Sequence, residues 1–298
     1  MRWTPGGVSS DIEDRRGAGG GGFGGGGGGF GFGRGPQVGC GGAVILLVLS
    51  LLFGRNFFTL VDGSGGGGAP GPVATEPGQQ VPPTSESPEE AKMVQFISFV
   101  LDDAQNTWTE VLRREGVEYP RAKLVLFRGV VESACGYAES ATGPFYCPAD
   151  GKVYIDLSFY SDLQERFGAP GDFAQAYVIT HEIGHHVQNV LGISDKVRQA
   201  QQSDSRNAND YSVRLELQAD CFAGIWGNTT QQRQLLEAGD VEEALNAASA
   251  IGDDRLQKSA GRRVNPDSFT HGSSAQRVEW FRRGMQSGRI ADCDTFGR

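Results

Sequence analysis

The spacing of apolar residues divides the second part of the chain into a short region of predicted strands and a longer region of predicted helices. Apolar residues three or four positions apart predict an amphipathic helix over residues 89–114. Ser87 suits the cap of this helix, and Pro88 suits its first turn. Further helices are predicted over residues 158–167, 172–191, 195–202, 209–226, 241–257 and 274–286.

The period changes between the first two of these helices. Strands are predicted over residues 123–127, 136–139, 144–147 and 152–157. The last two flank Asp150-Gly151, a sequence typical of a hairpin turn. A small antiparallel sheet together with many helices predicts an α+β domain rather than a doubly wound one.

A different apolar pattern lies earlier in the chain. Residues 38–61 are almost continuously apolar and are long enough to span a bilayer. Arg55 interrupts the run, but an arginine near a helix end can reach the interface. A cleaved signal peptide is the alternative, although the run starts late and no clear small-residue cleavage site follows. We therefore expect a retained transmembrane helix.

The arginines around this apolar run predict its orientation. Arg15, Arg16 and Arg34 precede the run, whereas only Arg55 lies near its far end. Because positive residues tend to stay inside, the N-terminus is expected in the cytoplasm. The protein would then be a single-pass protein of the cytoplasmic (inner) membrane with an extracytoplasmic C-terminal domain.

Composition suggests the remaining boundaries. The chain has 298 residues, and its 45 glycines are concentrated near the N-terminus. The Gly/Phe-rich residues 1–37 are expected to be a disordered cytoplasmic segment, with self-association as the alternative. The Pro/Gly-rich residues 62–88 read as a linker, which leaves residues 89–298 as the folded domain. A net charge of −9 without a basic patch argues against nucleic acid as a partner.

The candidate chemistry centres on His181-Glu182-x-x-His185 within the predicted helix 172–191. Residues i and i+4 lie on one face of a helix, so both imidazoles can bind one Zn²⁺ at about 2.0–2.1 Å. Glu182 lies beside the metal and can take a proton from a water whose pKa zinc lowers to about 7. The pattern therefore predicts zinc-dependent hydrolysis. His186 points to another face, and we expect it to be an ordinary polar or packing histidine.

A third metal ligand is predicted from the helix 209–226. This helix is unusually apolar, yet it carries Glu216 and Asp220 four residues apart. Buried acids need a partner, because an unpaired buried charge is very costly. Glu216 can bind the zinc, and Asp220 can accept the outer N–H of a ligand imidazole. A solvated acidic edge is the alternative.

Four cysteines in the domain suggest two disulfides. Cys135 and Cys147 flank the strand region and are close in sequence, so we expect them to pair, which leaves Cys221 with Cys293. Free buried thiols are the alternative. Disulfides are more common in an oxidising compartment, which agrees with an extracytoplasmic domain.

Four segments of the domain resemble the bacterial family of "putative neutral zinc metallopeptidases". They are residues 143–148, 181–186, 215–221 and 270–278. The resemblance covers essentially all of residues 89–298, and a glycine-rich start with a single anchor also fits it. It implies a zincin-type domain with the Glu-x-x-x-Asp arrangement of gluzincins and a peptidase activity. It implies no particular substrate.

The expected function is therefore a membrane-anchored zinc endopeptidase of the cell envelope, with one zinc per chain and a peptide or protein substrate. Residues 152–157 are expected to be an edge strand that binds the peptide in extended form. Glu182 would act first as base and then as proton donor to the leaving amine. The alternatives are a non-catalytic zinc-binding envelope protein and zinc hydrolysis of a bond other than a peptide.

A second donor to the developing oxyanion is also expected. His271 is the candidate, because it lies just before Ser273-Ser274-Ala275-Gln276, which resembles a capping box at a helix start. A residue at that place is well positioned to point into a cleft. Arg277, in the first turn of the same helix, is the alternative donor.

Overall fold

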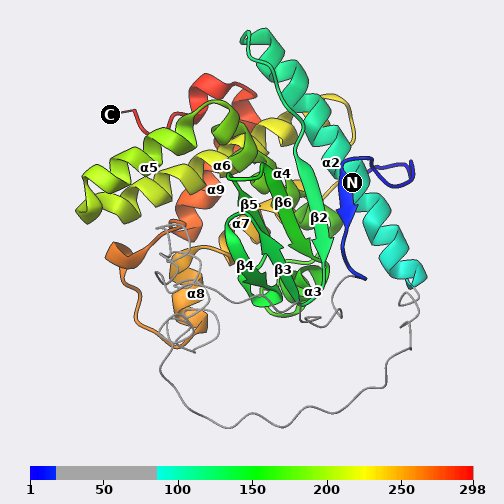
Figure 1. Cartoon of the computed structure of the whole chain (residues 1–298), viewed down its shortest axis with the longest axis horizontal. Coiled ribbons are helices and arrows are strands. Elements are labelled where there is room, and N and C mark those ends of the chain that lie inside the picture. The colour runs from blue at the N-terminus through cyan, green and yellow to red at the C-terminus, as the bar shows by residue number, and fades with distance from the viewer. Residues whose placement is uncertain (18–85, 298) are drawn as a thin grey trace, which may run out of the picture.

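The computed structural model describes residues 1–17 and 86–297. In this part of the chain the main sheet has four strands in the order β1-β2-β6-β5, and β3 and β4 form a separate hairpin (Figure 1). The strands are β1 (Ile12–Asp14), β2 (Lys123–Phe127), β3 (Val130–Ser133), β4 (Gly136–Glu139), β5 (Phe145–Cys147) and β6 (Lys152–Asp156).

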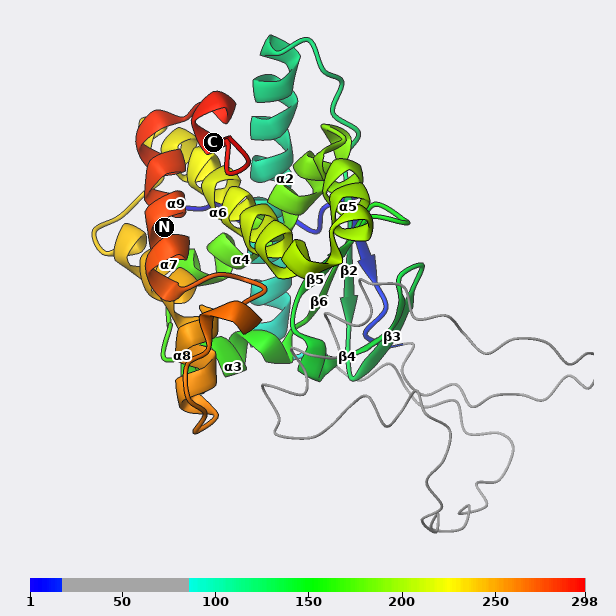
Figure 2. The ribbon, with the colours of Figure 1, turned by 90° about the vertical axis from the view of Figure 1, so that its left-hand side faces the viewer.

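Helices form the rest of the domain and lie mostly on one side of the sheet (Figure 2). They are α2 (Pro88–Arg114), α3 (Ser158–Glu165), α4 (Asp172–Val190), α5 (Ile193–Ser203), α6 (Ala208–Gln232), α7 (Asp240–Ala250), α8 (Asp253–Ser259) and α9 (Ser274–Ser287). The mixed α+β class agrees with the sequence prediction. The single helix expected over residues 241–257 is two helices, because the chain turns between α7 and α8.

The first and last long helices begin as their sequences predict. Ser87 caps α2, its side chain accepts from the backbone N–H of Glu90, and Pro88 occupies the first turn. Ser273 and Gln276 form the same reciprocal capping box at the start of α9. Local hydrogen-bonding rules suffice at both places, because the partners lie within three residues of each other.

The sheet differs from the expected antiparallel one. Within the four-stranded sheet of the described residues, only the β5–β6 pair is antiparallel, and its strands are joined by a turn in which Gly151 has a φ of +70°. β6 runs parallel to β2, and β1 also runs parallel to β2. The chain passes through the β3–β4 hairpin and then through β5, which runs opposite to β2. The turn after β5 reverses the chain again, so β6 runs in the same direction as β2. As a result β6 is a central strand, and the edge strands of this sheet are β1 and β5, which corrects the edge predicted at residues 152–157.

The first seventeen residues, which we call the amino-terminal strap, are part of the domain. Their β1 adds a strand to the sheet beside β2, and Met1 is only 5% exposed. The prediction of a disordered segment was therefore wrong for residues 1–17, since a glycine-rich neighbour hid a short run that packs on the domain. The predicted anchor at residues 38–61 lies outside the described residues, as does the linker as far as residue 85. None of the helices within residues 1–17 and 86–297 is long and apolar enough to cross a membrane.

The helices α6 and α9 approach each other unusually closely. A Cβ on Gly284 of α9 would lie 1.9 Å from the carbonyl oxygen of Cys221 on α6. A Cβ on Gly224 of α6 would lie 2.1 Å from the carbonyl oxygen of Phe281 on α9. Only glycine fits at such backbone contacts. The close crossing brings the first turn of α9 against the face of α6 that carries the acidic residues.

Candidate metal centre

Three side chains from two helices converge as the sequence predicts. The possible ligand atoms of His181, His185 and Glu216 all lie within 4.8 Å of one another. His181 Nε2 lies 3.2 Å from Glu216 Oε2, and His185 Nε2 lies 3.5 Å from Glu216 Oε1. Two imidazole nitrogens and a carboxylate oxygen facing one point fit the donor set of a catalytic zinc site.

Close packing of α4 on α6 makes this convergence possible. Gly184 lies between the two histidines, and a Cβ there would be 3.0 Å from the carbonyl oxygen of Ala219. A larger residue would push α6 away and carry Glu216 with it. The glycine of the motif therefore has a packing role next to the metal site.

A buried network orients His181. Its Nδ1 lies 2.9 Å from Asp220 Oδ1, and Asp220 is fully buried. Arg277 donates from Nε and Nη2 to the two oxygens of Asp220, both at 2.9 Å, and the Tyr177 hydroxyl donates to Asp220 Oδ1. The carboxylate therefore accepts the outer N–H of His181 and leaves Nε2 for a metal. This contact with the outer nitrogen of a ligand histidine is the one predicted for Asp220 from the sequence.

Arg277 has a different position from the one considered in the sequence analysis. Its side chain is 1% exposed and lies behind Asp220, where it forms a two-point pair with that carboxylate. A guanidinium so placed keeps the buried carboxylate ionised rather than facing a substrate. The structure thus favours Arg277 as the partner of Asp220 over Arg277 as an oxyanion donor.

His185 has an orienting partner that the sequence analysis missed. Its Nδ1 lies 2.8 Å from Gln188 Oε1, and the Gln188 amide donates to the carbonyl oxygen of Leu215 at 2.7 Å and to Gln218 at 3.1 Å. Gln188 is fully buried. The available signal was a glutamine within an apolar helix, three residues after a ligand.

Titration in the site reflects burial opposed by neighbouring charges. Burial alone would lower the pKa of His181, but Asp220 and Glu216 outweigh it and raise the pKa to about 9. Burial alone would raise the pKa of Glu216, but His185 and His271 outweigh it and hold the pKa well below the usual range. The metal-free site therefore holds a proton on His181 beside an ionised Glu216.

Glu182 is placed to act as a base beside the ligands. It is 7% exposed and follows His181 on the same helix. Burial raises its pKa, although the attraction of His181 and His185 opposes the increase. A carboxylate whose pKa is raised binds a proton more readily than an exposed carboxylate, which suits a general base.

His271 lies beside the ligand group without belonging to it. Asp253 fixes the loop, because Asp253 Oδ2 accepts from the backbone N–H groups of Thr270, His271 and Gly272 at 2.7, 2.7 and 3.1 Å. His271 Nδ1 lies 3.4 Å from Asp253 Oδ1. Burial alone would lower the pKa of His271, but Glu216 and Asp253 outweigh it and raise the pKa. A Cβ on the neighbouring Gly272 would lie 3.2 Å from the Leu217 side chain, so this loop packs on the helix that carries Glu216. Asp253 was not considered in the sequence analysis.

His186 faces away from the ligands, as expected. Its Nε2 lies 2.6 Å from the carbonyl oxygen of Pro120, and its Nδ1 lies 3.0 Å from the Tyr146 hydroxyl. Tyr146 belongs to β5, so His186 links the motif helix to the edge strand. Burial lowers the pKa of His186, which keeps the imidazole neutral at physiological pH.

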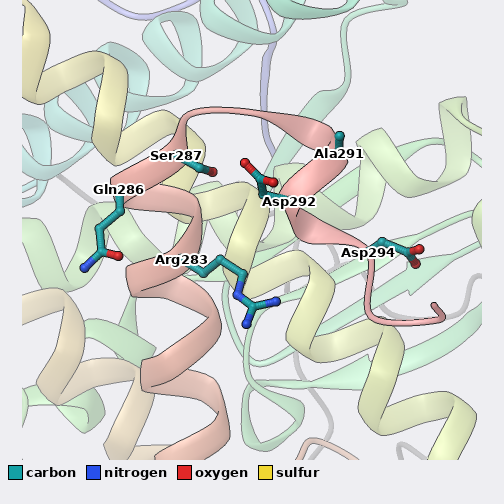
Figure 3. Close-up of a pocket in the computed structure, with 6 residues that line it drawn as sticks. All are labelled: Arg283, Gln286, Ser287, Ala291, Asp292 and Asp294. Atoms are coloured by element: carbon teal, nitrogen blue, oxygen red, sulfur yellow. The ribbon is translucent and has the colours of Figure 1, made fainter. Parts of the chain in front are cut away.

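Two further features lie away from this site. Asp172, Asp240 and Glu243 also form a group of acids, but the α-ammonium of Met1 lies 2.7 Å from Asp172 Oδ1 and 3.2 Å from Asp240 Oδ1. A shallow pocket lies at the end of α9 (Figure 3). Its lining is Arg283, Gln286, Ser287, Ala291, Asp292 and Asp294. None of these residues belongs to the metal centre.

Both expected disulfides are present. Cys135 pairs with Cys147, which ties the β3–β4 hairpin to the end of β5, and Cys221 pairs with Cys293, which ties the C-terminal segment to α6. Cys221 directly follows Asp220. The second bridge therefore supports the helix that carries the acidic part of the site.

Paired histidines one turn apart, an acid from a second helix and a buried glutamate beside them are the residue types and spacing that metal-dependent hydrolases use. The chain belongs to the family described as "Putative neutral zinc metallopeptidase", whose model matches residues 1–296. This agrees with the resemblance noted in the sequence.

The chain is similar to two bacterial proteins that are described as uncharacterized. It is 50% identical to uncharacterized protein YpfJ of Escherichia coli strain K12 over 301 residues, which covers 100% of this chain and 99% of that protein. It is 45% identical to uncharacterized protein Mb2605 of Mycobacterium bovis over 189 residues, which covers 60% of this chain and 63% of that protein. No solved structure matches the chain.

Proposed function

We propose that this protein is a zinc-dependent peptidase that hydrolyses peptide bonds with an activated water. The observation that carries the proposal is the convergence of His181, His185 and Glu216 within 4.8 Å, with Glu182 buried beside them. When bound, zinc would supply a Lewis acid that polarises the scissile carbonyl and lowers the pKa of a water. The family description supports the same reaction class.

The side chains of the site divide the remaining work. Glu182 takes the proton of the attacking water and passes it to the leaving amine. Asp220 and Gln188 accept from the outer nitrogens of the two histidines and keep the inner nitrogens directed at one point. His271, fixed by Asp253, donates to the carbonyl oxygen as negative charge develops there.

A peptide substrate fits the edge strand nearest to the motif helix. That strand is β5, which ends the sheet and pairs only with β6 among the described strands. Tyr146 of β5 bonds to His186 and accepts from Asn189, both on α4, so the free edge has a fixed position relative to the site. An extended peptide can add to such an edge through its main chain. Because the edge is read through the backbone, specificity depends on the side-chain contacts around it.

An oxidising compartment suits the two disulfides, so we place the domain in the cell envelope. The non-catalytic alternative requires a closed site with four protein ligands. The ligand group found among residues 1–17 and 86–297 has three members, His181, His185 and Glu216. The buried Glu182 lies beside this group, and a structural site does not need it. We therefore favour the enzyme.

Digestion of an unbiased peptide library by the full chain tests this proposal. The zinc-loaded protein should cleave peptides, and the chelated protein should not. Glu182→Gln is the matched control, since it keeps the size of the side chain. We expect it to retain zinc and to lose about 10²–10⁴-fold in rate, the usual contribution of a general base. Cleavage by Glu182→Gln at the parental rate would contradict the mechanism.

A further inference from the structure

The amino-terminal strap contacts the domain in two stretches, at residues 1–3 and again from Ser9 onward. At its start the α-ammonium of Met1 lies 2.7 Å from Asp172 Oδ1, at the first residue of α4. The Trp3 ring then packs edge-on against Phe96 of α2, with 5.4 Å between ring centroids. Further on, β1 pairs with β2, and Figure 1 shows this blue strand beside β2 and close to α2. The strap therefore crosses several elements before the sheet.

The middle of the strap supplies a buried charge to the domain. Asp11 is 6% exposed and accepts from Gln105 Nε2 at 3.0 Å, Arg121 Nε at 2.5 Å and Lys123 Nζ at 2.8 Å. Burial alone would raise the pKa of Asp11, but Lys123 and Arg121 outweigh it and lower the pKa. Removing Asp11 leaves Gln105, which is fully buried, without this partner. Leaving a buried polar group without its partner costs stability, so we expect the domain to be less stable without the strap.

The strap also completes the sheet. The N–H of Leu124 donates to the carbonyl oxygen of Asp11 at 2.8 Å, and the N–H of Arg15 donates to that of Leu126 at 2.8 Å. Glu13 forms an ion pair with Lys152 of β6 at 2.6 Å. Without the strap, β2 would be an edge strand with unpaired backbone groups. The family model spans residues 1–296 and therefore includes the strap.

These contacts restrict how the chain can meet a membrane. Atoms 2.8 Å apart must share a compartment, whereas the hydrocarbon core of a bilayer is about 30 Å thick. A single crossing by residues 38–61 would separate the strap from the domain. The strap of a second copy could not replace it, because in a copy with the same topology the strap would also lie across the membrane from the domain.

We propose that the strap and the domain of residues 86–297 lie on the same side of the cytoplasmic membrane. The arrangement with the N-terminus in the cytoplasm and the domain outside, which the arginines before residue 38 suggest, is incompatible with pairing of β1 and β2 in one chain. This inference depends on the sheet and not on the peptidase function.

Thiol labelling of the full chain in bacterial membranes tests the proposal. Ser10 in the strap and Ser259 at the end of α8 are both exposed, and each is changed to cysteine separately in a Cys40→Ser background. A membrane-impermeant maleimide is applied to spheroplasts and to inside-out vesicles, with detergent-opened samples as the labelling control. We expect Ser10→Cys and Ser259→Cys to label in the same preparation. Labelling of one in spheroplasts and the other in inside-out vesicles would overturn the proposal.

A stability measurement tests the docking itself. Asp11→Asn removes the buried charge, whereas Asp14→Asn makes the same change on β1 at a side chain that is 43% exposed and paired with Arg16. We expect Asp11→Asn to lower the Tm of the full chain by several degrees and Asp14→Asn to leave it nearly unchanged. Equal Tm values for parent and Asp11→Asn would show that the strap is not part of the domain, and would overturn the proposal.

Discussion

At the scale of single residues, each histidine of the site has a fixed proton position because a second side chain accepts from its outer nitrogen. Asp220 does this for His181 and Gln188 does it for His185. The two partners differ in charge, because Asp220 is a carboxylate and Gln188 is a neutral amide. The carboxylate at 2.9 Å stabilises a protonated His181 when no metal is present, whereas an amide offers no such charge.

Zinc affinity should therefore depend strongly on pH. The pKa of His181 in the metal-free protein is raised to about 9, so a metal must displace a proton at neutral pH. We expect the apparent Kd for zinc to fall by about tenfold per pH unit from pH 6.5 to 8.5 and to level off above pH 9, as measured by chelator competition. Folding of the metal-free protein should depend on pH in the opposite direction. The stability that protonated His181 contributes is fully present below pH 6.5 and is lost as the pH rises through about 9. A Kd independent of pH across this range would show that His181 is not protonated in the free site.

His271 is the second residue whose role can be measured. Its loop is fixed by Asp253, and its imidazole lies where Glu216 influences its charge. We expect His271→Ala to retain zinc and to lower the rate of peptide cleavage by about 10²–10³-fold, the usual loss for one oxyanion donor. An unchanged rate would leave His271 with a packing role, and loss of zinc would make it a ligand.

The sequence allowed the ligands of the site to be predicted but not all of their partners. His181, Glu182 and His185 follow from a helical spacing, and Glu216 and Asp220 follow from acids in an apolar helix. Arg277 and Tyr177 contact Asp220 from 57 and 43 residues away, so no local pattern relates them. Polar residues within apolar helices were the only available signal.

At the scale of elements, the crossing of α6 and α9 positions Arg277 behind Asp220. Gly284→Ala should disrupt it, because the new Cβ would lie 1.9 Å from the carbonyl oxygen of Cys221 and backbone cannot move as a side chain can. We expect a loss of about 1–3 kcal/mol or more. For a domain of this size that lowers Tm by about 2–4 °C per kcal/mol, measured by thermal unfolding.

A matched control exists at the same helix crossing. Gly227→Ala places its Cβ 3.3 Å from Met285 Sδ, the far part of a flexible side chain that can move aside. It should be tolerated much better than Gly284→Ala. Equal tolerance of the two substitutions would mean that α6 and α9 do not need their close approach.

The order of strands could not be predicted from their patterns. The hairpin β5–β6 was predicted, because its turn lies between the strands it joins. The parallel pair β2–β6 joins two strands that are separated in the chain by β3, β4 and β5. The periodicity of a strand predicts that it is a strand but does not indicate which strand it pairs with. The error moved the substrate edge from β6 to β5 and left the α+β class unchanged.

At the scale of the whole molecule, composition misled most at the N-terminus. Residues 1–17 were grouped with the glycines that follow, although Met1, Trp3, Ile12 and the charges around them pack on the domain. An average over a glycine-rich window conceals a short segment whose partners lie far along the chain, as Gln105 and Lys123 lie 94 and 112 residues from Asp11. The strap makes the domain larger than the unit predicted over residues 89–298, so functional work should use the full chain.

The central claim is one zinc ion held by His181, His185 and Glu216, and the most direct test is the metal content of the purified full chain. Elemental analysis should give one zinc per chain for the parent. Glu216→Ala removes one of three converging ligands and should lose most of the metal, whereas Glu237→Ala, a change at a half-exposed acid beside Met1, should retain it. Full zinc occupancy in Glu216→Ala would contradict this account of the site.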